Sequence, residues 1–234
     1  MSDIYRKHCF LTCFVEKLNN NGKWEKITGF KSHYYNPESE HFSSEKYSNA
    51  DEPFDDANDY ILALLGNKSL CYINKITPIY EPKDLPYNVS YDVEDYYYDF
   101  FEENKEYGCS YLTAQEIMDY KHKDDEITLT KYVTPYDYKI FKETGEAKNY
   151  RDLPIGTYVQ LVSNEYCDKY NNFDYMLTYT PITFKKTISE LCSWLFNDVY
   201  TQLMERSENK TGNDVRIIFW MHDYYEDVER TLFL

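Results

Sequence analysis

The run Val215–Met221 limits what this chain can fold into more than any other stretch. Its residues are apolar at every position except Arg216, so a strand made from it has two apolar faces. A strand with one solvated face alternates apolar and polar residues, whereas a strand covered from both sides shows no such alternation. The run therefore predicts a central strand with other elements packed on both faces.

Ahead of this strand, residues Thr183 to about Arg206 carry apolar side chains at intervals of three and four residues. This spacing is typical of one side of a helix. The side chains concerned are Phe184, Ile188, Leu191, Leu195, Val199 and Leu203. We expect a long C-terminal helix followed by the central strand.

Two further strands are indicated near the N-terminus. Residues 8–18 and 23–30 are strand-like and flank the turn sequence Asn19–Gly22, which predicts a hairpin. Strands and helices then alternate irregularly, which favours an α+β fold with a mixed or largely antiparallel sheet and packed helices. The 234 residues suit a single domain, 1–234, with the loop at 146–155 as the one candidate subdivision.

Two helix starts are marked by capping residues. Thr113 and Glu116 have capping-box spacing, in which each side chain bonds the backbone N–H of the other residue. Thr134 precedes Pro135 and Asp137, so a cap, a proline at the first helical position and an acid in the first turn coincide. Helices are therefore predicted to begin just after Thr113 and just after Thr134.

Residues 90–104 predict an acidic helix that begins at Ser90, a favourable N-cap. At about 100° per residue, one side of this helix is apolar and aromatic, with Val93, Tyr96, Tyr97, Phe100 and Phe101. The other side carries Asp92, Asp95, Tyr98, Asp99, Glu102 and Glu103. Either this acidic side is only solvated, or it binds a partner by competing for a basic groove that normally holds nucleic acid.

The net charge of −16 and the isoelectric point near 4.7 exclude some partners. A chain this acidic repels nucleic acid and anionic membranes unless a basic patch intervenes, and the sequence shows no such patch. We therefore expect no direct binding of nucleic acid or membrane. Tyrosine is unusually common, with 27 residues, which fits either an AT-rich genome or a recognition surface.

The six cysteines are dispersed, and no CxxC sequence occurs. The first residues lack a basic segment followed by an apolar one, and no apolar run approaches the roughly 20 residues of a membrane span. Reduced thiols in a cytosol are the simpler interpretation than a disulfide framework. We expect a cytoplasmic protein.

Motifs for catalysis and cofactor binding are absent, including GxGxxG, GxxxxGK, GxSxG and HExxH. His8, Cys9 and Cys13 do not predict a zinc site. On a strand His8 points away from the two cysteines, and no second Cys/His pair supplies further ligands. We expect no catalytic residues, no metal and no cofactor.

One alternative site lies at the end of the central strand, where His222 and Asp223 follow the apolar run. Arg216 and His222 fall on the same face of the strand, and strand ends often carry functional groups. These residues indicate a pocket for a small ligand or nucleotide, with hydrolysis as one activity, or simply a polar end to the strand.

Four stretches punctuate the chain with turn and capping residues: Asn21-Gly-Lys-Trp24, Pro78…Pro82-x-x-Leu85-Pro86-x-x-Val89-Ser90, Ser110-x-Leu112-Thr113-x-x-Glu116 and Asp214–Trp220. Together they resemble an uncharacterised family of small proteins found in phages and bacteria. The chain departs from that pattern at Ser110-Tyr111, where Ser-Trp is common in the family. The resemblance implies a mobile-element origin and supplies no catalytic residues.

Composition, the acidic helix and the resemblance together predict a non-enzymatic phage or mobile-element protein that acts in the cytoplasm of a host cell. It is expected to bind and inhibit a host defence or nucleic-acid-handling protein through an acidic, tyrosine-rich surface. The alternatives are the small-ligand, nucleotide-binding or hydrolase site near His222 and Arg216, and a structural or assembly role.

Overall fold

The computed structural model describes residues 6–31, 59–67, 71, 74–81, 83–103, 109–152, 159–169 and 178–226. The side chains of residues 6–10, 100–103 and 222–226 lie outside this description, although their backbone belongs to helices or strands. The chain forms two compact units, the first made of Met1–Asp124 and Ile188–Leu234 and the second of Asp125–Thr187. Residues 146–155 lie inside the second unit and not at its boundary. That residues 1–234 form a single domain stays a prediction. A single cooperative unfolding transition shared by the two units would support it.

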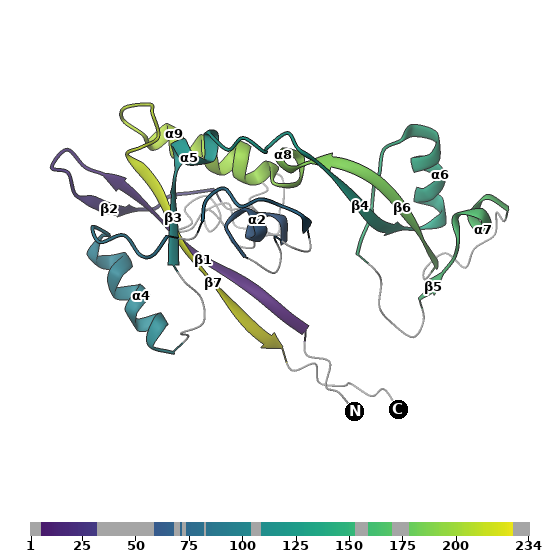
Figure 1. The fold of residues 1–234 in the computed structure, drawn as a ribbon, viewed down its shortest axis with the longest axis horizontal. Helices are drawn as coiled ribbons and strands as arrows, with labels where there is room; N and C mark the ends of the chain where they lie inside the picture. The colour runs from purple at the N-terminus through teal and green to yellow at the C-terminus, as the bar shows by residue number, and fades with distance from the viewer. Residues whose placement is uncertain are drawn as a thin grey trace. The chain divides into compact units, whose positions relative to one another are not determined.

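The first unit contains a four-stranded antiparallel sheet with the order β2-β1-β7-β3 (Figure 1). The strands are β1 Arg6–Leu18, β2 Trp24–Ile27, β3 Cys109–Thr113 and β7 Val215–Glu226. The predicted N-terminal hairpin is therefore present as β1 and β2. The predicted central strand is confirmed, because β7 lies between β1 and β3 and no residue from Val215 to Met221 is more than 9 % exposed.

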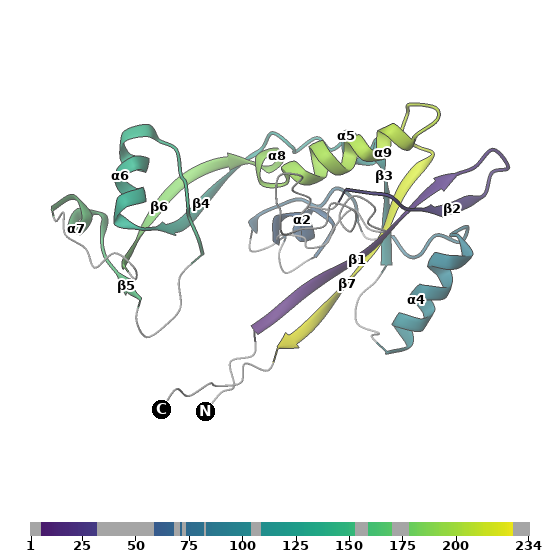
Figure 2. The same ribbon diagram turned by 180° about the vertical axis from the view of Figure 1, so that it is seen from behind.

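The first unit also contains helical segments. Those in its described part are α2 Asp59–Leu64, α4 Tyr91–Glu103, α5 Ala114–Met118, α8 Ile188–Leu191, the π-helical turn η1 Trp194–Val199 and α9 Tyr200–Arg206. Helices α5 and α9 pack on β7, and Figures 1 and 2 show α4 on the other side of the sheet. The alternation along β7 explains both contacts. Ile218 and Trp220 point towards Val93 of α4, so Ile217 and Phe219 point to the opposite face.

The second unit contains a smaller mixed sheet with the order β4-β6-β5. Its strands are β4 Glu126–Val133, β5 Gln160–Leu161 and β6 Thr178–Thr187, with β4 antiparallel and β5 parallel to β6. Helices α6 Pro135–Thr144 and α7 Asn164–Lys169 supply part of its core, in which Val133, Tyr138, Cys167 and Ile182 are buried together. The predicted α+β class is confirmed, with two sheets in place of one.

The prediction of one long helix from Thr183 to about Arg206 is wrong. Strand β6 continues to Thr187 and pairs with β4 from Thr180 to Thr187, and helical structure begins at Ile188. Phe184, which fits the helical spacing, instead packs with the core of the second unit. A π-helical turn also interrupts the helical stretch, although Leu195 and Val199 in it are buried as the spacing predicts.

Both predicted helix starts are confirmed. Thr113 and Glu116 form both bonds of the capping box, with donor–acceptor distances of 2.9 and 3.2 Å. Thr134 caps α6 by accepting the backbone N–H of Asp137, and α6 ends at Gly145 in the left-handed conformation. Within the described ranges, no helix is both long and apolar enough to cross a membrane.

Candidate functional site

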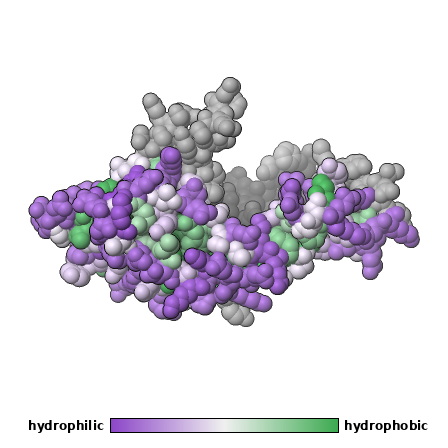
Figure 3. Space-filling view, turned by 90° about the horizontal axis from the view of Figure 1, so that it is seen from above, coloured by the Kyte–Doolittle hydropathy of each residue, from purple (hydrophilic) through white to green (hydrophobic). Residues whose placement is uncertain are grey.

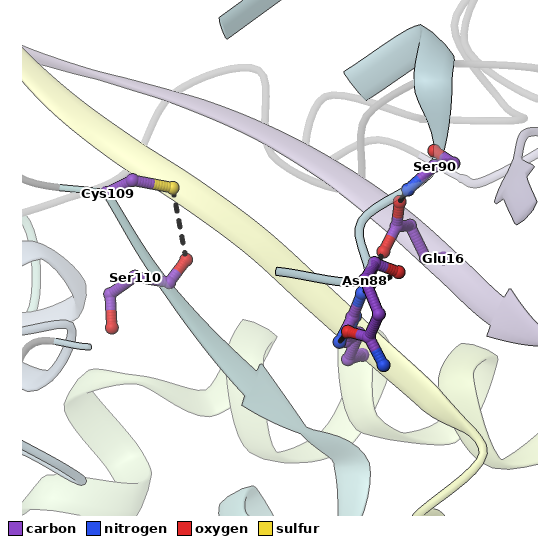
Figure 4. A network of polar contacts seen from close by, with 6 residues as sticks. Glu16, Asn88, Ser90, Cys109 and Ser110 are labelled. Atoms are coloured by element: carbon purple, nitrogen blue, oxygen red, sulfur yellow. Dashed lines mark hydrogen bonds and ion pairs between the residues drawn. The ribbon is translucent and has the colours of Figure 1, made fainter. Parts of the chain in front are cut away.

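The start of α4 is held by a buried carboxylate on β1. Glu16, which is 0 % exposed, accepts the backbone N–H of Ser90 at 2.6 Å (Figure 4). The helix begins at Tyr91, as the predicted N-cap at Ser90 requires, but Ser90 Oγ makes no hydrogen bond among the described residues. The prediction that the Ser90 side chain caps the helix is therefore wrong. Glu16 supplies the negative charge that favours a helix N-terminus.

Arg216 of β7 completes this polar group. Its guanidinium donates to Glu16 Oε2 at 2.7 and 2.9 Å and to the side chain and backbone oxygens of Asn88 at 3.1 and 3.3 Å. It also lies 3.9 Å from the centre of the Trp24 ring. Because Arg216 is only 3 % exposed and its donors are engaged inside the fold, it serves to join the sheet to the start of α4.

The alternative site is not assembled around Arg216. His222 lies six residues further along the same extended strand, which corresponds to about 20 Å. The backbone of His222 is opposite Phe10 and that of Asp223 opposite Cys9, while the side chains of both lie outside the described part. Arg216 and His222 thus belong to one strand but lie too far apart to line one small pocket.

The inner side of α4 is fixed by aromatic packing. Val93 is fully buried and Tyr97 is half-buried, as predicted. The Tyr97 ring packs edge-on against Trp220 at 5.4 Å, and Tyr96 packs edge-on against Phe14 at 5.0 Å. Burial is the main cause that raises the pKa of Tyr97 to about 12, with smaller contributions from Cys109, Tyr98 and Asp84, so this phenol stays neutral. The helix therefore presents a defined outer side.

The outer side of α4 is acidic and rich in tyrosine. We define the acidic tyrosine face as six exposed residues on this side, Tyr91, Asp92, Glu94, Asp95, Tyr98 and Asp99. Tyr96, predicted on the apolar side, is also 49 % exposed, although its ring packs on Phe14. Asp92, Asp95, Tyr98 and Asp99 are exposed as the periodicity predicts, while the side chains of Glu102 and Glu103 lie outside the described part. Tyr91 and Glu94 are members that the sequence prediction omitted. Their position in the first turn, on the polar side of the helix, was the available signal.

The charge of the chain is concentrated in the unit that carries this face. The second unit contains nine acidic and eight basic residues and so has a net charge of −1, which leaves −15 for the first unit. Hydrophilic side chains also cover most of the described surface seen in Figure 3, with hydrophobic ones in small patches between them. A positively charged partner is therefore attracted chiefly to the first unit.

The described thiols are buried or half-buried and are poor nucleophiles. Cys71, Cys109, Cys167 and Cys192 are free thiols, Cys13 is buried, and the side chain of Cys9 lies outside the described part. Burial raises the pKa of both Cys109 and Cys192 to about 12, so both remain protonated near neutral pH. Figure 4 shows Cys109 directed at the backbone oxygen of Ser110.

A metal centre has no support in the part of the chain that the structure describes. Among those residues, no group of three or more His, Cys, Asp or Glu side chains is placed to hold a metal ion.

Comparison with known proteins returned no matching family model, no matching curated protein and no matching solved structure. The resemblance to phage and bacterial proteins stays a prediction from the sequence.

Proposed function

We propose that this chain is a non-enzymatic interaction protein of phage or mobile-element origin. It acts in the cytoplasm of a host cell, where it binds and inhibits a defence or nucleic-acid-handling protein. The acidic tyrosine face of α4 is the contact surface, and a basic groove on the partner is its target.

The observation that carries this proposal is the separation of the two sides of α4. One side is anchored through Val93 and Tyr97, and the start of the helix is held by Glu16. The acids on the other side are exposed, and α4 belongs to the unit that carries nearly all of the net charge. A fixed row of carboxylates imitates the phosphates that a basic groove normally binds, and it speeds association by long-range attraction.

The small-ligand, nucleotide-binding or hydrolase alternative has less support. Arg216, its proposed cation, is buried and paired with Glu16, so releasing it for a ligand leaves a carboxylate buried without a partner.

The test uses three tagged full-length proteins expressed in a bacterial host. They are the wild type, Asp95→Lys/Asp99→Lys and the charge-matched control Glu143→Lys/Glu205→Lys, which alters exposed acids on α6 and α9. Wild type and control are expected to capture a basic nucleic-acid-binding protein at low salt, whereas the α4 variant loses it.

The captured protein is then purified and its binding is measured at low and high salt. Added nucleic acid is expected to displace the wild type, and the α4 variant is expected to associate at least tenfold more slowly at low salt. Equal affinity of wild type and α4 variant at every salt concentration would show that the face is only solvated.

A further inference from the structure

The chain holds one of its own arginines between a carboxylate and two aromatic rings. The guanidinium of Arg216 lies 3.9 Å from the centre of the Trp24 ring and 5.5 Å from that of Tyr111. The same group pairs with Glu16 at 2.7 Å. Ring faces attract the cation through their quadrupole, while the carboxylate neutralises its charge.

A lysine is held in the same way on the neighbouring part of the first unit. The ammonium of Lys83 lies 4.1 Å from the centre of the Tyr80 ring and 4.3 Å from that of Tyr111, and it pairs with Glu116 at 2.8 Å. Two of the cations in this unit are thus bound by the same combination of tyrosine or tryptophan rings and one carboxylate.

The acidic tyrosine face repeats this combination on exposed residues. With about 100° per residue, Tyr91, Asp95 and Tyr98 fall within one stripe roughly 60° wide, on the side of α4 opposite Val93. Tyr91 is 74 % exposed and Tyr98 is 58 % exposed, and Asp95 between them is also exposed. The seven steps along the helix from Tyr91 to Tyr98 cover about 10 Å of its axis.

We propose that this stripe binds arginine side chains of the partner, stacked on the Tyr91 and Tyr98 rings and paired with Asp95. The inference rests on the proposed function and specifies its partner as one that presents an arginine-rich segment. Arginine is favoured over lysine because its planar guanidinium stacks on a ring while its N–H groups bond a carboxylate in a forked geometry. It is also less strongly hydrated than an ammonium, so less solvation is lost on contact.

The test measures the preference for arginine over lysine in full-length protein. Fluorescently labelled nona-arginine and nona-lysine peptides are the probes, and binding is followed by anisotropy at physiological salt. The two peptides carry the same charge, so general attraction to the acidic unit contributes similarly to both. The wild type is expected to bind nona-arginine about fivefold more tightly than nona-lysine, because a guanidinium stacks on the rings and bonds Asp95 at the same time, whereas an ammonium does so less effectively.

Three double variants identify the rings responsible. Tyr91→Ala/Tyr98→Ala is expected to bring the arginine-to-lysine affinity ratio close to one, whereas Tyr91→Phe/Tyr98→Phe keeps the rings and the preference. The matched control Tyr136→Ala/Tyr166→Ala removes two exposed tyrosines from α6 and α7 and is expected to leave the ratio unchanged.

Equal binding of the two peptides by the wild type, or an unchanged ratio in Tyr91→Ala/Tyr98→Ala, would overturn the arginine preference. If a basic host protein is still captured through Asp95 and Asp99 in that case, the proposed function stands without this specificity. A ring-dependent arginine preference without capture of any basic protein has the opposite meaning: the stripe is confirmed and the proposed function is refuted.

Discussion

Gly212 occupies a position where the backbone and the available space both require glycine. Its φ is +73°, and an added Cβ lies 2.9 Å from Ala114 Cβ, 2.9 Å from Met204 Sδ and 3.0 Å from the backbone N of Gln115. The same Gln115 N–H donates to Gly212 O at 3.3 Å, so the loop before β7 is held against α5 at this point. Gly212→Ala therefore adds backbone strain and a steric clash together.

The two costs are separated by a matched variant, Gly22→Ala, in the same unit. Gly22 has φ +75°, but a Cβ added there meets no described atom beyond its chain neighbours within 4 Å. The left-handed conformation costs an alanine about 1 kcal/mol at either site. Overpacking adds about 1–3 kcal/mol at Gly212 alone. We expect losses of unfolding free energy of about 1 kcal/mol for Gly22→Ala and about 2–4 kcal/mol for Gly212→Ala.

Urea unfolding followed by tryptophan fluorescence is the assay. All three tryptophans, Trp24, Trp194 and Trp220, belong to the first unit, so the signal reports on the unit that contains both glycines. Circular dichroism before unfolding checks that each variant keeps its secondary structure. Equal losses for the two variants would refute the steric argument, because backbone strain alone would then account for both.

Four other outcomes are expected. Ile217→Asp places an unpaired charge at a 2 % exposed position of β7 and is expected to cost about 4 kcal/mol or more; a soluble protein with an unchanged melting temperature would contradict this. Glu16→Ala leaves Arg216 buried without its anion and is expected to cost about 3–5 kcal/mol in urea unfolding, while Glu16→Ala/Arg216→Met costs less than the two single changes together. Burial favours the neutral form of Asp214, but hydrogen bonds from Ser207 Oγ and backbone N–H groups outweigh it and hold the Asp214 pKa below its ordinary value. Its stabilising contribution is thus present above about pH 4 and lost as the pH falls through the folded-state pKa, so wild type and Asp214→Asn should differ less in unfolding free energy at pH 3 than at pH 7. Titration of the unfolded, non-reduced protein is expected to find six free thiols, and markedly fewer would reveal a disulfide.

Local signals in the sequence were enough to predict the helix starts and the central strand. The capping box at Thr113 involves residues only three apart in the sequence. The unbroken apolar run of β7 is itself the pattern of a strand buried on both faces. Strand β3 was missed because Cys109–Thr113 is short and owes its strand conformation to pairing with β7, about a hundred residues later. The end of β6 was misassigned because Phe184 and Ile188 are four apart, a spacing that a strand–helix junction and a continuous helix share.

The polar group at the start of α4 was missed for a related reason. Glu16 and Arg216 are 200 residues apart in the chain, and each is a charged residue within a largely apolar strand. Such a pair of opposite charges is a usable signal, because a charge on a buried strand requires a partner. The outer side of α4 was more accessible to prediction, since helical periodicity alone separates Asp95 from Val93.

The chain leaves the first unit after Asp124 and returns to it at Ile188. The backbone N–H of Ser189 donates to the carbonyl of Lys123 at 2.8 Å, so the first unit brings together the points where the chain leaves and returns. Residues 125–187 thus have the topology of an insertion within the first unit, between two chain ends that lie side by side. Insertions are tolerated at such sites because they leave the host core intact. The ancestry of the two units can accordingly differ, and relatives of the first unit are best sought with residues 125–187 removed.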